Sequence, residues 1–148
     1  MLTDSNPDPE TLLKIYLIED STIVRDNLIE LLRETLPVEI VGIASSEPEL
    51  RQWLREDRTP CDLVIVDIFL QDGSGLGVLT ARQEFDAPGR WVVLSNHATP
   101  EMRRRCLDLG ADAVFDKSNE IEGLLLYCKH LAGLDAIGDA RNSLEAAL

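Results

Sequence analysis

Five short apolar runs alternate with segments of helical periodicity, and this alternation constrains the fold more than any other feature of the chain. The runs are residues 15–18, 38–43, 63–66, 91–94 and 113–115. Continuous Val, Ile and Leu, without polar residues at every second position, are typical of parallel strands that are covered on both faces. The segments between the runs repeat apolar residues every three or four positions, as amphipathic helices do. The sequence therefore predicts an α/β fold with a five-stranded parallel sheet and helices on both faces.

Local signals predict several helix ends. Ser46 followed by Glu49 is a capping-box pattern, and Thr99 before a proline is typical of a helix start. Ser118 is expected to cap the last helix. Gly110 stands where a helix would end in a left-handed residue.

The chain of 148 residues has the usual size of one domain. Residues 1–13 are polar and contain two prolines, so they are predicted to form a flexible N-terminal arm. Residues 14–132 are predicted to form the domain itself. Residues 133–148 are predicted to form a C-terminal extension, either a short helix or a linker.

The composition excludes several classes of protein. With 27 acidic and 14 basic residues the net charge is -13, which repels phosphate backbones and anionic lipids and argues against binding to nucleic acid or membranes. No apolar run approaches the roughly 18 residues of a membrane-spanning helix, and the first residues do not resemble a signal peptide. The three cysteines lack metal-ligand spacing and are expected to be reduced. The sequence thus predicts a soluble cytoplasmic protein.

Polar residues follow four of the five predicted strands where each strand ends. They are Glu19 and Asp20 after the first run, Asp67 after the third, Ser95 after the fourth and Lys117 after the fifth. Because the carboxyl ends of parallel strands meet at one edge of the sheet, these side chains are expected to converge. Three clustered carboxylates repel one another, and Mg²⁺ is the cation that suits such oxygen ligands. With a lysine and a hydroxyl nearby, the set fits phosphoryl transfer to an aspartate.

The motifs IYLIEDS, LVIVDIFLQDGSG, VVLSNHA and GADAVFDKS occur in this order along the chain. With these motifs, residues 14–132 resemble the receiver domain of the response regulators of two-component signal transduction systems. The resemblance implies a flavodoxin-like receiver fold with strand order 2-1-3-4-5. It also implies a signalling phosphoprotein rather than a separate enzyme, one that catalyses only its own phosphorylation and dephosphorylation.

The resemblance also implies a role for each matching residue. Asp67 would be the phosphoacceptor. Mg²⁺ would be bound directly by Asp20 and Asp67, through water by Glu19, and by the backbone carbonyl of Phe69. Ser95 and Lys117 would each contact an oxygen of the phosphoryl group on Asp67.

The implied partners are a histidine kinase or histidine phosphotransfer protein, which donates the phosphoryl group in a phosphorelay, and a downstream protein target. No direct contact with nucleic acid or membrane is expected, and a phosphorylation-dependent dimer is left open. Two alternatives remain: a degenerate receiver that binds a partner without phosphorylation, and an aspartate-nucleophile phosphohydrolase. The second alternative usually has another aspartate two residues after the nucleophile, where this chain has Phe69.

One residue in the last predicted strand departs from the family pattern, and an arginine triplet lies outside the family motifs. Val114 occupies the position at which many receivers carry a switching Tyr or Phe, while Phe115 is one residue further on and should face the other side of its strand. Coupling through an aromatic rotation is therefore in doubt. The arginine triplet of residues 103–105 is either a solvated helix face or a contact surface for an acidic partner.

Overall fold

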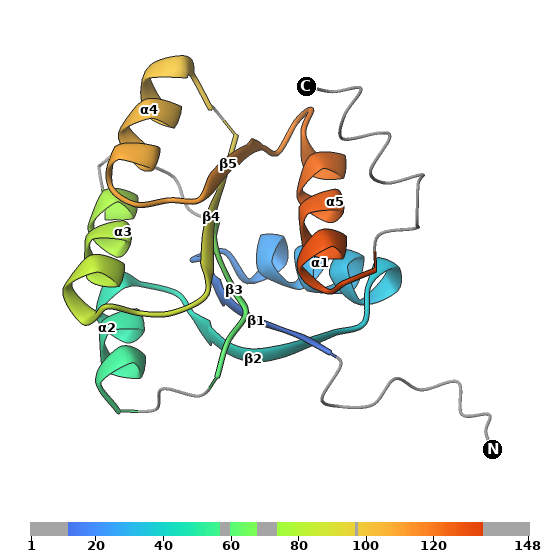
Figure 1. The fold of residues 1–148 in the computed structure, drawn as a ribbon, viewed down its shortest axis with the longest axis horizontal. Helices are drawn as coiled ribbons and strands as arrows, with labels where there is room; N and C mark the ends of the chain where they lie inside the picture. Colours follow the sequence, from blue (N-terminus) through green and yellow to red (C-terminus); the bar gives the residue numbers. More distant parts are fainter. Residues whose placement is uncertain (1–11, 57–59, 68–73, 97, 135–148) are drawn as a thin grey trace.

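Five βα units follow one another in the part of the chain that the computed structural model describes, residues 12–56, 60–67, 74–96 and 98–134. The elements are β1 (Leu13–Ile18), α1 (Thr22–Thr35), β2 (Val38–Ala44), α2 (Glu47–Glu56), β3 (Leu63–Asp67), α3 (Ser74–Phe85), β4 (Arg90–Ser95), α4 (Pro100–Asp108), β5 (Ala113–Asp116) and α5 (Ile121–Leu131). All strand pairs are parallel, and the order across the sheet is β2-β1-β3-β4-β5 (Figure 1). The predicted fold is confirmed.

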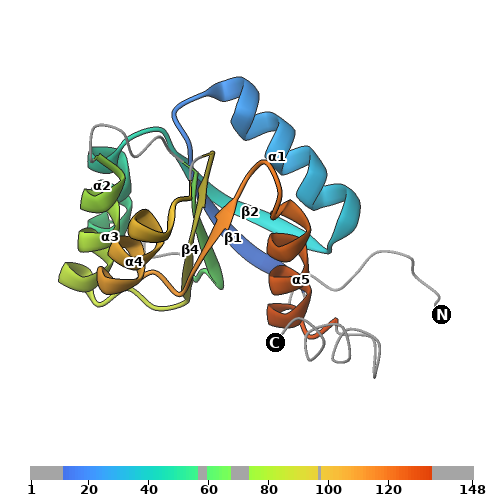
Figure 2. The same ribbon diagram turned by 90° about the horizontal axis from the view of Figure 1, so that it is seen from above.

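Two hydrophobic cores lie on the two faces of the sheet. Helices α2, α3 and α4 cover one face, and α1 and α5 cover the other (Figure 2). In β1, Tyr16 and Ile18 enter the first core while Ile15 and Leu17 enter the second. Successive residues of a strand face opposite sides, so a strand with a core on each side must be apolar throughout. This requirement explains the continuous apolar runs in the sequence.

Two predicted helix ends are confirmed. The Thr99 side chain accepts a hydrogen bond from the backbone amide of Met102 at 3.2 Å and caps α4. Gly110, just beyond the end of α4, has a φ of 105° and donates its amide hydrogen to the carbonyl of Leu107 at 3.0 Å. Only glycine adopts this left-handed conformation readily, which is why it marks the helix end.

The two other predicted ends differ from the expectation. Ser46 accepts a hydrogen bond from the amide of Glu49 at 3.4 Å, but the Glu49 carboxylate reaches the amide of Ser45 at 2.8 Å, one residue further back than a capping box requires. The prediction for Ser118 was wrong, since it does not cap α5. Its hydroxyl and amide donate to the carboxylate of Asp116 instead, and the residue at the N-cap position of α5 is Glu120.

An irregularity in the edge strand β2 changes the direction of its side chains. The register between β1 and β2 shifts by one residue at Val41, so that Tyr16 pairs with Gly42. The Tyr16 ring covers Gly42 so closely that a Cβ atom there would lie 2.5 Å from a ring carbon. Tyr16 also stacks on Trp53 of α2 with 4.0 Å between the ring centroids. The absence of a side chain at Gly42 thus permits the bulge and the ring stack.

The described elements run from Leu13 to Leu131 and lie within the predicted domain, apart from one residue at its start. Residues 1–11 of the predicted arm and residues 135–148 of the predicted extension lie outside the described residues, and both remain predictions. Among the described residues, no helix combines the length and the apolar character needed to cross a membrane.

We expect Gly42→Ala to lower the free energy of unfolding by about 1–3 kcal/mol, because the added methyl group overlaps the Tyr16 ring. Chemical denaturation measures this loss. In a Tyr16→Leu background the same substitution should cost less, because the ring is gone. Equal losses in both backgrounds would contradict the packing argument.

Candidate functional site

The carboxyl edge of the sheet brings together the residues that the sequence singled out. Asp67 ends β3 and Ser95 ends β4, and both are buried, Asp67 completely. Glu19 follows β1 and is 3% exposed, whereas its neighbour Asp20 is exposed. Lys117 follows β5, and its amide donates to the carbonyl of Ser95 at 2.8 Å. The ends of four strands thus place three carboxylates, a hydroxyl and an ammonium group at one edge.

Lys117 supplies the ammonium group of this cluster. Its Nζ atom forms an ion pair with Oδ1 of Asp67 and lies 3.6 Å from Oε1 of Glu19. Both carboxylate oxygens of Asp67 are shielded from solvent, and neither accepts a conventional hydrogen bond from the described residues apart from this ion pair. Because a buried carboxylate with a single ion pair among the described residues is costly, the arrangement is typical of a functional group rather than of a structural one.

The carboxylates outnumber the ammonium group, and the excess negative charge is reduced by a proton. The pKa of Glu19 is raised to about 8, first by burial and then by the carboxylates of Asp20 and Asp67, while the amide of Ser21, which donates to Glu19 at 2.7 Å, acts in the opposite direction. Burial also raises the pKa of Asp67, whereas the hydrogen bond and the positive charge of Lys117 act to lower it. At neutral pH the metal-free cluster therefore keeps a proton on Glu19.

The cluster fits a hard divalent cation by its charge and its oxygen donors. Among the described residues, no group of three or more His, Cys, Asp and Glu side chains is arranged as a metal site. The charge of the cluster nevertheless suits a cation, which could replace the proton that Glu19 holds. Phe69, whose carbonyl was predicted to complete the ligands, lies outside the described residues.

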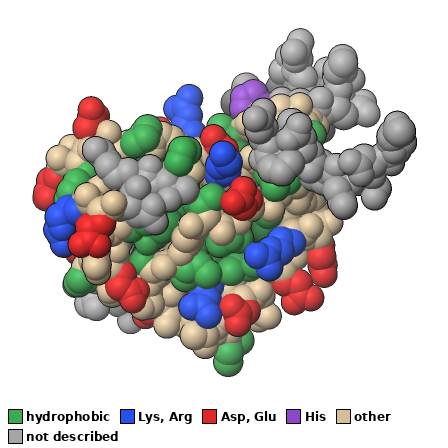
Figure 3. Space-filling view, turned by 90° about the horizontal axis from the view of Figure 1, so that it is seen from below, with side chains coloured by type: hydrophobic (Ala, Val, Ile, Leu, Met, Phe, Trp, Pro, Cys, Tyr) green, Lys and Arg blue, Asp and Glu red, His purple; other side chains and the backbone are tan. Residues whose placement is uncertain are grey.

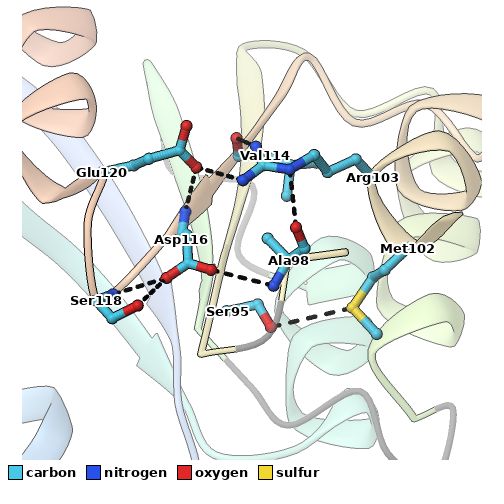
Figure 4. A network of polar contacts seen from close by, with 8 residues as sticks. All are labelled: Ser95, Ala98, Met102, Arg103, Val114, Asp116, Ser118 and Glu120. Carbon is cyan, nitrogen blue, oxygen red and sulfur yellow. Dashed lines mark hydrogen bonds and ion pairs between the residues drawn. The ribbon is translucent and has the colours of Figure 1, made fainter. Parts of the chain in front are cut away.

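A network of polar contacts adjoins the site on the side of α4 (Figure 4). The guanidinium group of Arg103 donates to three acceptors: the carbonyl of Ala98 at 2.9 Å, the carbonyl of Val114 at 3.2 Å and the carboxylate of Glu120 at 2.5 Å. These acceptors belong to the segment before α4, to β5 and to the start of α5. Arg103, whose side chain is 32% exposed, is therefore held by contacts within the domain and differs from both interpretations of the triplet, whereas Arg104 and Arg105 are exposed.

Asp116 joins the same network from β5. Its carboxylate accepts hydrogen bonds from the amide of Ala98 at 3.3 Å and from the amide of Ser118 at 2.8 Å, while its own amide donates to Glu120 at 2.9 Å. Hydrogen bonds from Ser118 lower the pKa of Asp116, and the ion pair with Arg103 lowers that of Glu120. Both groups are thus ionised at neutral pH, and Ala98 is held through both its amide and its carbonyl.

The residues around β5 confirm the predicted departure from the aromatic switch. Val114 packs into the core beneath α2, α3 and α4, while Phe115 packs on the opposite face. There Phe115 meets Tyr127 of α5 edge to face, with 5.8 Å between the ring centroids. The Ser95 hydroxyl contacts Sδ of Met102 at 4.0 Å. No aromatic side chain of β5 therefore faces the side on which Ser95 approaches α4.

Fold and site together define a parallel α/β domain with an acidic, lysine-paired site at the carboxyl edge of its sheet. Residues 15–129 match the family model of the response regulator receiver domain, and the chain belongs to this family. It is 30% identical over 115 residues to protein-glutamate methylesterase/protein-glutamine glutaminase 1 of Methanospirillum hungatei, which covers 76% of this chain and 33% of the relative. It is 32% identical over 121 residues to the nitrate/nitrite response regulator protein NarL of Escherichia coli K12, which covers 82% of this chain and 54% of that protein.

The chain spans about a third and about half of the length of these two relatives. Solved structures share the fold. The response regulator domain of Thermotoga maritima CheB has a TM-score of 0.69 at 18% identity, covering 84% of this chain and 99% of that one. The CheX-CheY-BeF3-Mg+2 complex from Borrelia burgdorferi gives a TM-score of 0.70 at 19% identity, covering 80% of this chain and 88% of that one.

We expect the free energy of unfolding of the metal-free protein to fall as the pH rises from about 4.5 to about 8, because protonated Glu19 is favoured only in the folded state. The contribution is complete below the ordinary value of 4.5 and is lost as the pH passes the folded value of about 8. Glu19→Gln, which cannot ionise, should weaken this fall. Urea denaturation with a chelator present, at several pH values in this range, measures the slope; an unchanged slope in the variant contradicts the assignment.

Proposed function

We propose that this receiver domain accepts a phosphoryl group on Asp67 from a histidine kinase or a histidine phosphotransfer protein of a phosphorelay. The observation that carries the proposal is the fully buried Asp67 carboxylate, paired with Lys117 at the carboxyl edge of the sheet. Membership of the receiver family supports it. The phosphorylation would change the contacts with a downstream protein, and the pathway would operate in the cytoplasm.

The chemistry requires few groups from the protein. An oxygen of Asp67 attacks the phosphorus of a phosphohistidine, a new P–O bond forms, and the P–N bond breaks with its electron pair leaving on the imidazole. The transferring group is highly charged, so positive charge and correct placement supply most of the catalysis. Lys117 provides the charge, and Ser95 donates a hydrogen bond to the acyl phosphate that results. The domain changes only its own covalent state, and in this sense it is not a separate enzyme.

Mg²⁺ is the cofactor that the donor set suits. Asp20 and Asp67 would hold it directly and Glu19 through water, with the carbonyl of Phe69 as a further ligand. When bound, the ion neutralises carboxylate charge and phosphoryl oxygens.

The first turn of α1 offers a contact for the phosphodonor. Ile23 is 73% exposed and Val24 is 36% exposed, and both follow closely after Asp20 in the chain. Exposed aliphatic side chains beside an acidic site are typical of a surface that a partner covers. A phosphodonor that packs on this turn would bring its phosphohistidine to the site.

Two other functions are less well supported. A phosphohydrolase of the aspartate-nucleophile type would have an acid two residues after Asp67, where the chain has Phe69. A degenerate receiver would have lost members of the cluster, whereas Glu19, Asp20 and Lys117 are all present beside Asp67.

We expect the protein to gain one phosphoryl group when incubated with acetyl phosphate and Mg²⁺, and Asp67→Asn to abolish the gain, because an amide is not a nucleophile for phosphorus. Intact mass spectrometry measures the addition. Asp108→Asn, which changes an exposed aspartate at the end of α4, is the matched control and should be labelled normally.

Undiminished labelling of Asp67→Asn would refute the assignment of the phosphoacceptor. Sustained turnover of a phosphate ester would favour the phosphohydrolase instead, and an unlabelled wild-type protein would favour the degenerate receiver. Asp20→Ala should need a higher Mg²⁺ concentration for the same labelling, because a carboxylate ligand is lost.

In this chain the phosphorylation signal would reach α4 through polar contacts rather than through an aromatic side chain. A phosphoryl group on Asp67 attracts the Ser95 hydroxyl and so draws the end of β4 towards it. The segment after Ser95 contains Ala98, which Asp116 holds at its amide and Arg103 at its carbonyl. Displacement of Ala98 therefore strains the contacts that join α4 to β5 and to the start of α5.

We expect the Arg103→Gln variant still to accept a phosphoryl group on Asp67. In wild type, amide hydrogen exchange in α4 should differ between the phosphorylated and unphosphorylated forms, and the variant should lose most of this difference. The reason is that the guanidinium group joins three elements that a shorter amide side chain cannot span. Arg104→Gln, on the exposed face of the same helix, is the control. If both variants keep the full difference, the network does not transmit the signal.

A further inference from the structure

We propose that the groove between α1 and the edge strand β2 is a docking surface for a basic amphipathic helix of a partner protein. The groove has a volume of about 550 Å³. It shares no residue with the phosphorylation site, so the proposal goes beyond the function argued above. Three properties support it: an apolar floor, an acidic rim, and the charge of the chain's own segments.

The floor of the groove is formed by Ile40 and Ile43 of β2 together with Ile29 of α1. In a regular strand two residues three positions apart face opposite sides of the sheet. The bulge at Val41 and Gly42 inserts one residue, so both isoleucines face α1, and Ile43 stays 42% exposed. Bulges on edge strands commonly redirect a side chain in this way. The exposed apolar floor is thus a consequence of the same contact between Gly42 and Tyr16 that fixes the register.

The rim along α1 is acidic. Asp26, Glu30 and Glu34 line the groove at intervals of four residues, with Arg33 as the basic residue among them. Four residues correspond to about 6 Å along a helix axis, so the three carboxylates extend over about 12 Å. Lysine or arginine side chains four residues apart on a second helix repeat at the same interval and could pair with the carboxylates. The apolar side of that second helix would then cover the isoleucines.

Figure 3 looks onto this side of the molecule. A patch of hydrophobic side chains lies near the centre of the view, and acidic side chains surround it together with a few basic ones. The patch is not covered by described residues. An exposed apolar surface with a charged rim is typical of protein contact sites.

The charge of the chain itself argues for a different protein as the occupant. Residues 1–11 contain Asp4, Asp8 and Glu10 and no Lys or Arg, and residues 135–148 contain three acidic residues against Arg141 alone. A second copy of the chain, with its net charge of -13, would also bring like charge to the rim. A helix with Leu or Ile on one face and Lys or Arg beside it complements both the floor and the rim.

The test uses a synthetic Leu/Lys peptide of about 14 residues, roughly 20 Å long as a helix, whose leucines lie on one face. We expect it to bind the wild-type protein, to become helical on binding, and to bind equally to Asp67→Asn. A peptide of the same composition with leucines distributed around the helix, and one with Glu in place of Lys, are the controls. Both should bind at least about tenfold more weakly.

Two variants test the location. Glu30→Lys combined with Glu34→Lys should weaken binding about tenfold or more, and Ile43→Ser should weaken it as well. Glu101→Lys combined with Glu122→Lys changes the net charge equally at exposed positions of α4 and α5, and should have an effect below about threefold.

Equal loss in the two charge-reversal variants would overturn the proposal, because binding would then follow net charge alone. An extended bound peptide, or self-association of the protein through Ile43 in sedimentation experiments, would also overturn it. Labelling of Asp67 by acetyl phosphate is measured separately on the wild-type sample, so a failure here is distinguishable from a failure of the proposed function.

Discussion

The ion pair between Lys117 and the buried Asp67 carboxylate is the interaction on which the rest of the site depends. A carboxylate without exposed surface is costly unless a positive charge accompanies it, and Lys117 is the basic residue that contacts it. The lysine reaches Asp67 because its own amide is fixed to the carbonyl of Ser95 at the neighbouring strand end. Glu19, which Lys117 also approaches, then retains a proton. The site is thus left with excess negative charge, the condition that favours a cation.

Much of the fold could be predicted because a parallel sheet that is buried on both faces requires continuous apolar strands. This requirement is visible in short stretches of the sequence. The parts of the strands buried between the two cores had to be apolar at successive positions, and each helix had to repeat apolar residues on one side. Helix ends were predictable where the signal was local, as at Thr99 and Gly110. The helix signal at Ser118 failed because a second local acceptor competed: Ser118 donates to Asp116, two residues before it. The bulge in β2 could not be predicted because it depends on the ring of Tyr16 in another strand.

The site shows the same division. Its carboxylates, hydroxyl and lysine could be predicted because parallel strands bring their carboxyl ends to one edge, whatever the details of packing. The Arg103 network could not, because its partners come from three separate elements and Arg103 lies 17 residues from Glu120 along the chain. In the sequence, an arginine within a charged helix segment looks like a solvated residue, and nothing nearby indicates that it has three hydrogen-bond acceptors. Val114 put coupling through an aromatic rotation in doubt, but it did not indicate that Arg103 would form these contacts.

The packing of the helices indicates which of them can respond to phosphorylation. On α1, Leu28, Ile29 and Leu32 are buried against the sheet, so this helix and the groove beside it are held by apolar contacts. On α4, Cys106 is the one fully buried residue, Met102 packs partly buried against the same core, and the polar contacts of Arg103 join the helix to β5 and to the start of α5. Polar contacts depend steeply on geometry, whereas apolar contacts tolerate small shifts. A displacement at the end of β4 should therefore move α4 and leave α1 in place. The surface formed by α4 would then change with phosphorylation, whereas the groove beside α1 would not.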